Sequence, residues 1–277
     1  MTARTLALIV FDSTEAAWLI PMASSVAFSL DAHLTVLHPF RPIVFASGYM
    51  AEPSYYASIR AWEEEEAEKI RELVREQTRA NGLQYEYRPQ KDLYGAESYL
   101  LSSARGADLI LLGSNRAPGR SPDDRGLAER LIRAAGRPVL VLDEASRPAL
   151  PAERIVIGWS DTREATRAAH DALTLAAPGA AIELVTVLAH AYEDRPGLDA
   201  REDLAAAFDR LGFQVTVTDR SGVAGDRAAE LVRAAREGGA GLLATGAFGH
   251  SRLYDFAIGA VTRDLLETAE IPLLVSH

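Results

Sequence analysis

Three glycines near the end of the chain, Gly246, Gly249 and Gly259, have a spacing that suits anion binding. Two residues separate the first pair and nine separate the second pair. The apolar run 241–245 before them predicts a buried strand, and the amphipathic run 261–269 after them predicts a helix. A glycine-rich turn between a strand and a helix leaves backbone N–H groups beside the positive end of the helix dipole. These residues therefore predict a phosphate-binding turn.

This spacing differs from those of the two best-known phosphate loops. No Gly-Lys-Ser/Thr ending follows the glycines, and no compact Gly-x-Gly-x-x-Gly follows the first strand. Glycine suits such a turn because a side chain would keep a phosphate away from the backbone, and because some turns need a positive φ. The alternative is that the same glycines form a helix cap and two ordinary turns.

Two neighbouring runs extend the pattern. Gly249-His-Ser-Arg-Leu253 begins at the second glycine, and the chain ends in Ile271-Pro-Leu-Leu-Val-Ser-His277. With the glycine spacing, these runs resemble the nucleotide-binding motif and the chain ending of the universal stress proteins. In that family Ser or Thr normally follows the last glycine, whereas Ala260 follows it here. The difference affects one phosphate contact.

The resemblance implies which residues hold an adenine nucleotide. The three glycines would cradle the phosphates, and the backbone of Val187, near the end of a strand-like run, matches the place where the family reads adenine. Further donors would be the amides of three residues beside the glycines: His250, Ala260 and Val261.

A strand-like run also ends at Trp159-Ser160-Asp161, where the family usually offers an Asp to the nucleoside. An earlier strand of the chain ends at Asp12, and either Ser160 or Asp161 aligns with it. Trp159 is interpreted either as a core residue or as a ring that packs on the ligand. His250 is interpreted either as a surface residue that caps the loop or as a phosphate contact.

The chain contains this pattern twice. At a constant separation of 133 residues, Arg116 stands in the first copy where the second copy has Gly249. A long arginine at that place predicts that the first site is altered and binds another anion or nothing. Three other parts of the pattern recur: Gly106-Ala107 as Gly239-Ala240, Gly113 as Gly246, and Gly126 as Gly259.

Strand-like and helix-like runs alternate along both copies, which predicts the α/β class with parallel strands and helices on both faces. We expect two tandem three-layer α/β/α domains, each with a five-stranded parallel sheet. The resemblance identifies them as adenine nucleotide alpha hydrolase-like. Residues 1–145 form the first domain, with the degenerate loop, and residues 152–277 form the second, with the glycine motif. In the family, last strands pair between domains, so 139–142 and 273–275 would give an intramolecular pseudo-dimer; a homodimer is the alternative.

Prolines and glycine in the run 39–58 predict a loop before a long helix over 59–80. Aromatic residues in 40–56 are interpreted as cover for the core edge, or as a cover over a ligand pocket or a surface for a protein partner. The second copy is expected to begin with a strand over Ile155–Trp159, a helix over Arg163–Ala176 and a strand over Ile182–Leu188.

Composition narrows the class of protein. The 277-residue chain has a formal net charge of −10, which disfavours a nucleic-acid partner, and it has no cysteine for disulfides or thiolate sites. No apolar run reaches the roughly 18 residues of a membrane span, and the first residues do not have the pattern of a signal peptide. We therefore expect a cytoplasmic protein with no membrane partner.

Enzyme chemistry finds no support in the motifs. The six histidines form no His-Glu-x-x-His pair, and no Gly-x-Ser-x-Gly elbow occurs. The resemblance implies a stress-response or signalling protein that binds ATP, ADP or AMP, with Mg²⁺ entering beside the nucleotide and at most slow ATP hydrolysis. The main alternative is a nucleotide-free interaction scaffold in which both sites have decayed. An adenylating enzyme is a third reading, disfavoured because no substrate domain is left over.

Overall fold

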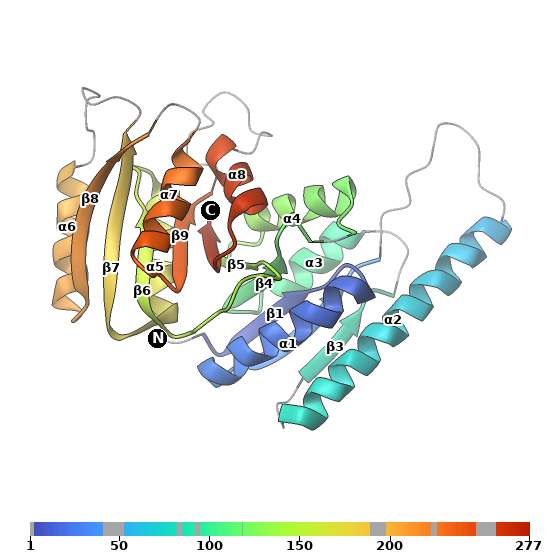
Figure 1. Ribbon diagram of the computed structural model, residues 1–277. Coiled ribbons are helices and arrows are strands. Elements are labelled where there is room, and N and C mark those ends of the chain that lie inside the picture. Colours follow the sequence, from blue (N-terminus) through green and yellow to red (C-terminus); the bar gives the residue numbers. More distant parts are fainter. Residues whose placement is uncertain are drawn as a thin grey trace.

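A computed structural model describes residues 3–40, 53–81, 85–91, 95–117, 119–188, 198–222, 226–247 and 259–277. Ten strands form one continuous sheet across the molecule (Figure 1). Their order is β3 (Tyr85–Pro89), β2 (His33–His38), β1 (Thr5–Ile9), β4 (Leu109–Gly113), β5 (Val139–Leu142), β10 (Leu273–Ser276), β9 (Leu242–Gly246), β6 (Ala152–Gly158), β7 (Ala176–Leu188) and β8 (Gln214–Ser221).

Each half of the sheet consists of parallel strands, β1–β5 in the first half and β6–β10 in the second. The halves meet where β5 and β10 run antiparallel, with Leu140 opposite Leu274. This is the pairing expected between the last strands of the two copies. The α/β class, with a mostly parallel sheet, is confirmed.

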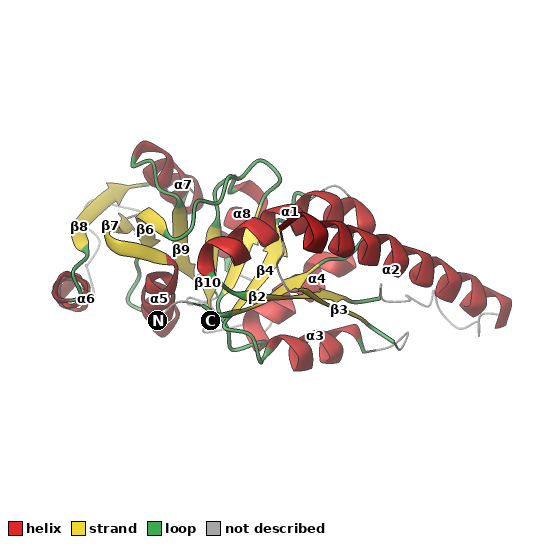
Figure 2. Cartoon of the chain, turned by 90° about the horizontal axis from the view of Figure 1, so that it is seen from below, coloured by secondary structure: helices red, strands yellow, loops and turns green. Residues whose placement is uncertain are grey.

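Helices cover both sides of the sheet (Figure 2). One hydrophobic cluster packs under α1, α2, α5 and α6, and a second packs under α3, α4, α7 and α8. Burial on both faces explains why strands such as β1 and β4 are continuous apolar runs. The helices are α1 (Ser13–Leu30), α2 (Pro53–Asn81), α3 (Ala96–Ala104), α4 (Pro122–Ala134), α5 (Arg163–Ala172), α6 (Leu198–Arg210), α7 (Arg227–Glu237) and α8 (Ala260–Thr268).

Helix α2 begins earlier than expected. The predicted loop extended to Ser58, whereas the helix starts at Pro53 and continues to Asn81. Proline is compatible with the first turn of a helix, where its missing N–H costs no hydrogen bond, so Pro53 starts this helix instead of excluding it. Residues 41–52 of the aromatic segment 40–56 lie outside the described residues, and Tyr55 and Tyr56 fall within α2.

The passage from α5 to β7 also differs from the expectation. Helix α5 ends at Ala172, a 3₁₀ turn (η1) covers Leu173–Leu175, and β7 begins at Ala176 instead of Ile182. Pro178 and Gly179, with a φ of 73° at the glycine, disfavour a helix here. The early part of β7 pairs with β6 through a register shift between Ala152 and Arg154. Tertiary pairing therefore extends this strand beyond its apolar run.

None of the described helices has an apolar stretch long enough to cross a membrane.

Candidate functional site

The predicted site residues of the second half lie around the carboxyl ends of its strands. Gly246 is the last residue of β9, Trp159 and Ser160 follow β6, and Val187 lies near the end of β7. Because these strands are parallel neighbours, their ends share one edge of the sheet. An open parallel sheet binds ligands at this kind of edge. Gly259 caps helix α8, which starts at Ala260 and Val261.

Two residues of the predicted phosphate cradle, Gly249 and His250, lie outside the described residues. The two outer glycines of the motif, Gly246 and Gly259, are described, and packing explains only the first of them.

Gly246 is required by packing. A Cβ atom at this position would lie 2.5 Å from the backbone nitrogen of Ala165 and 2.6 Å from the carbonyl carbon of Glu164. The first turn of α5 therefore contacts the end of β9 directly, and only glycine allows this approach. In contrast, Gly259 has an ordinary φ of −59°, and the nearest atom to an added Cβ is 4.0 Å away. Packing among the described residues gives no reason for glycine there.

Trp159 packs into the hydrophobic core and is 8% exposed. Its indole Nε1 is buried and has no hydrogen-bond partner within the described part of the chain. The side chain of Ser160 lies 3.2 Å from the hydroxyl of Thr162, the N-cap of α5, while Asp161 is exposed.

The strand register decides which residue corresponds to Asp12. The N–H of Val10 bonds to Leu37, and the N–H of Trp159 bonds to Val185 at the same step of the second half. Asp161 therefore takes the place of Asp12 along the strand. The connection to the helix is one residue longer in the second half, so Thr162 takes over the N-cap role that Asp12 has in α1.

The equivalent edge in the first half is filled by a buried ion pair between Glu15 and Arg120, whose side chains are 2% and 1% exposed. Glu15 Oε2 accepts a 2.9 Å hydrogen bond from the N–H of Phe11, and Arg120 Nη2 contacts Glu15 Oε1 and donates to the carbonyl of Gly113 at 3.1 Å. The guanidinium also lies over the Phe11 ring, 4.5 Å from its centroid. Motif reasoning did not single out either charged residue.

Burial raises the pKa of Glu15 above its ordinary value. The charge of Arg120 and the N–H of Phe11 act in the opposite direction, and the nearby charge of Asp12 adds to the increase. The pKa is raised because the removal of this carboxyl group from water outweighs the two opposing effects.

Arg116, which the sequence places at the altered position of the first loop, forms contacts with the second half instead. Its guanidinium lies 3.2 Å from Glu270, and the same carboxylate accepts a 2.8 Å hydrogen bond from Arg236. The adjacent N–H of Asn115 bonds to the carbonyl of Leu266 in α8. The arginine that lies at the strand ends is therefore Arg120, and Arg116 joins the two halves.

Polar contacts also lie at the end of β2 in the first half and near the end of β7 in the second. In the second half, Arg201 of α6 donates to Thr186 at 2.7 Å and to Asp219 at 2.6 Å, and its side chain is 5% exposed. In the first half, Nε2 of buried His38 lies 4.0 Å from a carboxylate oxygen of buried Glu63 of α2. The buried helix residue is thus an acid, Glu63, in the first half and a base, Arg201, in the second. Arg201 bonds to Thr186, which precedes Val187 in β7.

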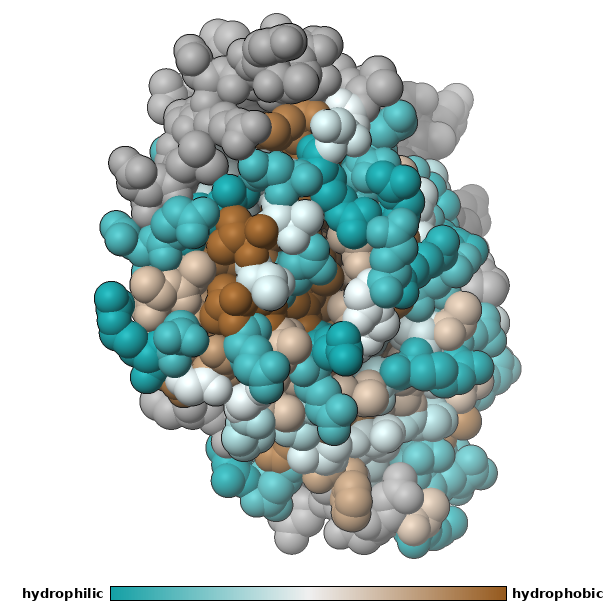
Figure 3. Space-filling view, turned by 60° about the vertical axis from the view of Figure 1, so that its left-hand side comes forward, coloured by the Kyte–Doolittle hydropathy of each residue, from teal (hydrophilic) through white to brown (hydrophobic). Residues whose placement is uncertain are grey.

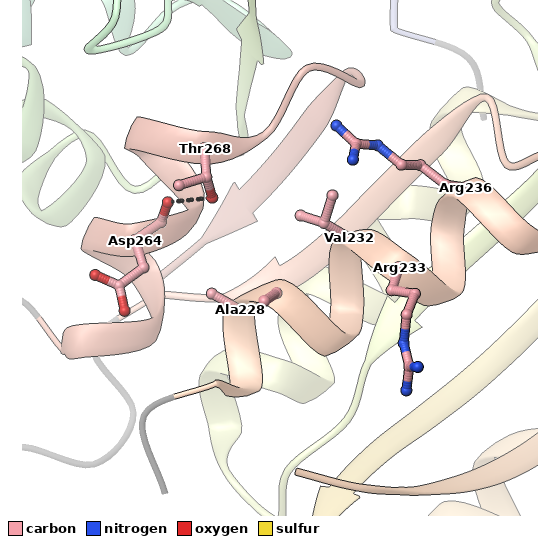
Figure 4. Close-up of a pocket in the computed structure, with 7 residues that line it drawn as sticks. Ala228, Val232, Arg233, Arg236, Asp264 and Thr268 are labelled. Carbon is pink, nitrogen blue, oxygen red and sulfur yellow. Dashed lines mark hydrogen bonds between the residues drawn. The ribbon is translucent and has the colours of Figure 1, made fainter. Parts of the chain in front are cut away.

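Two surface grooves lie elsewhere and are lined by none of the predicted site residues. One, of about 480 Å³, lies between α7 and α8, with Val232 in its floor and Arg233, Arg236 and Asp264 around it (Figure 4). The other, of about 680 Å³, lies beside the edge strand β3. In the face shown in Figure 3, apolar side chains gather in one patch surrounded by hydrophilic ones. Within the described residues, no group of three His, Asp or Glu side chains is placed to hold a metal ion.

The fold is an α/β fold with a mostly parallel sheet, and the strand ends of its two halves are packed by different groups. Residues 151–277, the second half of the chain, match the model of the universal stress protein family.

Solved structures with the same fold span nearly the whole chain. A universal stress protein from Archaeoglobus fulgidus DSM 4304 has a TM-score of 0.69 and 13% identity, covering 98% of this chain and 97% of its own. A functionally unknown protein from Pseudomonas aeruginosa PAO1 has a TM-score of 0.57 and 17% identity, covering 99% and 92%. At these identities the similarity concerns the fold. No curated protein matches the sequence.

Proposed function

We propose that this protein binds an adenine nucleotide (ATP, ADP or AMP) at the carboxyl ends of the strands in its second half. We further propose that it acts in stress response or signalling through this binding, and not as an efficient catalyst. The observation that carries the proposal is the difference between the two edges. In the first half the backbone N–H of Phe11, just beyond β1, bonds to Glu15. In the second half the equivalent N–H, that of Ser160, has no acceptor among the described residues.

The described residues fit an anionic ligand. The N-terminus of α8 offers the N–H groups of Ala260 and Val261 to an anion. Gly259, whose lack of a side chain is not explained by packing among the described residues, would let a phosphate approach the backbone. The glycine spacing through Gly249 and the family match add to this argument. In the bound state, phosphates would lie at these amides, with the nucleoside toward Ser160, Asp161 and Val187. Mg²⁺ would enter with the phosphates.

The test begins with nucleotide released from the purified protein by denaturation and identified by mass spectrometry, followed by calorimetry with ATP. We expect about one adenine nucleotide per chain. Ala165→Glu adds a carboxylate at the helix position that Glu15 has in α1, without a paired arginine, so ATP affinity should fall at least tenfold. Thr166→Glu is the matched control, because it adds the same charge at the exposed neighbouring position.

Circular dichroism checks that both variants fold, and Gly249→Arg, which copies the first half, provides an independent loss of binding. If wild type, Ala165→Glu and Gly249→Arg bind ATP equally, the site assignment is wrong. If no nucleotide is released and ATP does not bind to wild type, the nucleotide-free scaffold becomes the better description, and the segment 40–56 becomes the first region to test for a protein partner.

A further inference from the structure

We propose that the first half contains a built-in occupant of its own anion site: the side-chain carboxyl group of Glu15, held by Arg120, takes the place of an external anion at the ends of β1 and β4. This inference goes beyond the proposed function, because it concerns the other half of the chain. It holds whether or not the second half binds a nucleotide.

The first argument is the set of hydrogen-bond donors around Glu15. One carboxyl oxygen accepts from the backbone N–H at the end of β1, and the other contacts the guanidinium of Arg120. The residue lies in the first turn of α1, where the helix dipole favours negative charge. Backbone N–H, helix N-terminus and arginine are the donors that proteins use for carboxylates and phosphates. Here the protein supplies the anion as well.

The second argument is an incompletely satisfied arginine. Arg120 Nη2 is used twice, for Glu15 and for the carbonyl of Gly113, whereas the buried Nη1 has no partner within the described part of the chain. A core side chain selected only for packing has no need of a cation here, because a buried ion pair is often no more stable than apolar residues of similar volume. The arginine therefore marks a place suited to an anion.

The third argument is the space at the strand end. A Cβ atom on Gly113 would overlap Glu15 Oε1 and would lie 2.9 Å from Arg120 Nη2, so the ion pair rests directly on this glycine. The repeated glycine motif thus keeps its first glycine in both halves for different contacts. Gly113 makes room for a side-chain carboxyl group, whereas Gly246 makes room for the α5 backbone.

The fourth argument is the matching position in the second half. Glu15 and Ala165 are both third residues of their helices, and each donates its N–H to the N-cap side chain, Asp12 at 2.8 Å and Thr162 at 3.2 Å. The side chain of Ala165 ends at Cβ, so it leaves the N–H of Ser160 without the acceptor that Glu15 gives to Phe11. The half without this carboxyl group is the one proposed to accept a ligand.

The experiment is chemical rescue of Glu15→Ala. The substitution deletes the equivalent of an acetate ion and leaves Arg120 buried without its counterion. We expect a lower Tm in chloride buffer and a saturable rise of roughly 2–4 °C when sodium acetate replaces sodium chloride at equal ionic strength. Wild type should show no acetate-specific rise. Glu97→Ala is the matched control, because it removes an exposed 2.8 Å ion pair with Arg130 and leaves no buried cation.

A double variant, Glu15→Leu with Arg120→Met, removes both charges, and it should fold and show no response to acetate. If Glu15→Ala does not fold in chloride, acetate should increase its refolding yield over that in chloride. Equal Tm and equal refolding yield in the two salts would overturn the proposal, as would the same acetate response in the double variant. No nucleotide takes part in this measurement, so its outcome is separate from that of the ATP experiment.

Discussion

Glu15 and Arg120 show how a pair of charges far apart in the sequence can be accommodated inside a small site. The two residues stand 105 positions apart, and their side chains are almost completely removed from solvent. Each charge alone would be costly in such a place, and removing one partner of a buried pair leaves an uncompensated charge that typically costs about 3–5 kcal/mol. Arg201, which bonds to Thr186 and Asp219, is a further buried arginine in the second half.

The raised pKa of Glu15 leads to a pH prediction. The folded chain binds a proton to this carboxyl group more readily than the unfolded chain does, and burial is the main cause. The linked stabilisation is therefore fully present below the unfolded pKa, near 4.5, and is lost as pH rises through the folded pKa. Glu15→Gln has no proton to exchange and should lack this dependence.

Urea unfolding of wild type and Glu15→Gln across this pH range measures the effect. The unfolding free energy of wild type, relative to the variant, should decrease as pH rises above about 4.5. A relative stability that stays constant or increases over the same range would contradict the raised pKa.

The glycines that end β4 and β9 govern how elements approach one another. The first turn of α5 contacts the end of β9 so closely that no Cβ is tolerated at Gly246. The same helix carries Thr162 and Ala165, so this contact also fixes the position of the proposed ligand edge. Gly259 precedes α8, and no atom of the described residues lies closer than 4.0 Å to a Cβ added there.

Gly246→Ala should lower the unfolding free energy by about 1–3 kcal/mol, because the added methyl group meets backbone atoms that cannot move independently. Gly259→Ser is the control: its φ suits any residue, and serine is a favourable helix N-cap. Its stability should stay within about 0.5 kcal/mol of wild type. Chemical denaturation measures both, and equal stability of the two variants would show that α5 can shift away from β9.

At the scale of the whole molecule, the continuous sheet joins the two copies. Leu140 and Leu274 are fully buried where β5 and β10 meet, and Glu270 binds an arginine from each half. The Asn115 N–H also donates to α8. These contacts connect the loop of the first half to the helix that begins at the proposed nucleotide site.

We therefore expect the two halves to unfold together. Trp159 is the only one of the three tryptophans in the second half, so Trp18→Phe with Trp62→Phe leaves it as a local probe. Its fluorescence transition in urea should coincide with the circular dichroism of the whole chain. Leu274→Ala should move both transitions together and cost about 2–5 kcal/mol. Separate transitions in the double tryptophan variant would show that the copies are independent.

Local patterns in the sequence determine the class of fold, because buried parallel strands need continuous apolar runs and because helices between them need an apolar face. They also predict two copies, and the resemblance predicts that the last strands of the copies pair. The glycine spacing and its resemblance predict a nucleotide site, which stays a prediction for all of its residues.

Only the tertiary structure decides which side chains meet at the strand ends. Motif spacing directed attention to Arg116, yet Arg120 lies at the first edge, because chain folding brings it to Glu15 while Arg116 reaches Glu270. Pairing with β6 likewise extends β7 beyond its apolar run. Contacts between residues distant in sequence depend on how whole helices and strands pack, and the local spacing of residues does not specify which side chains will meet.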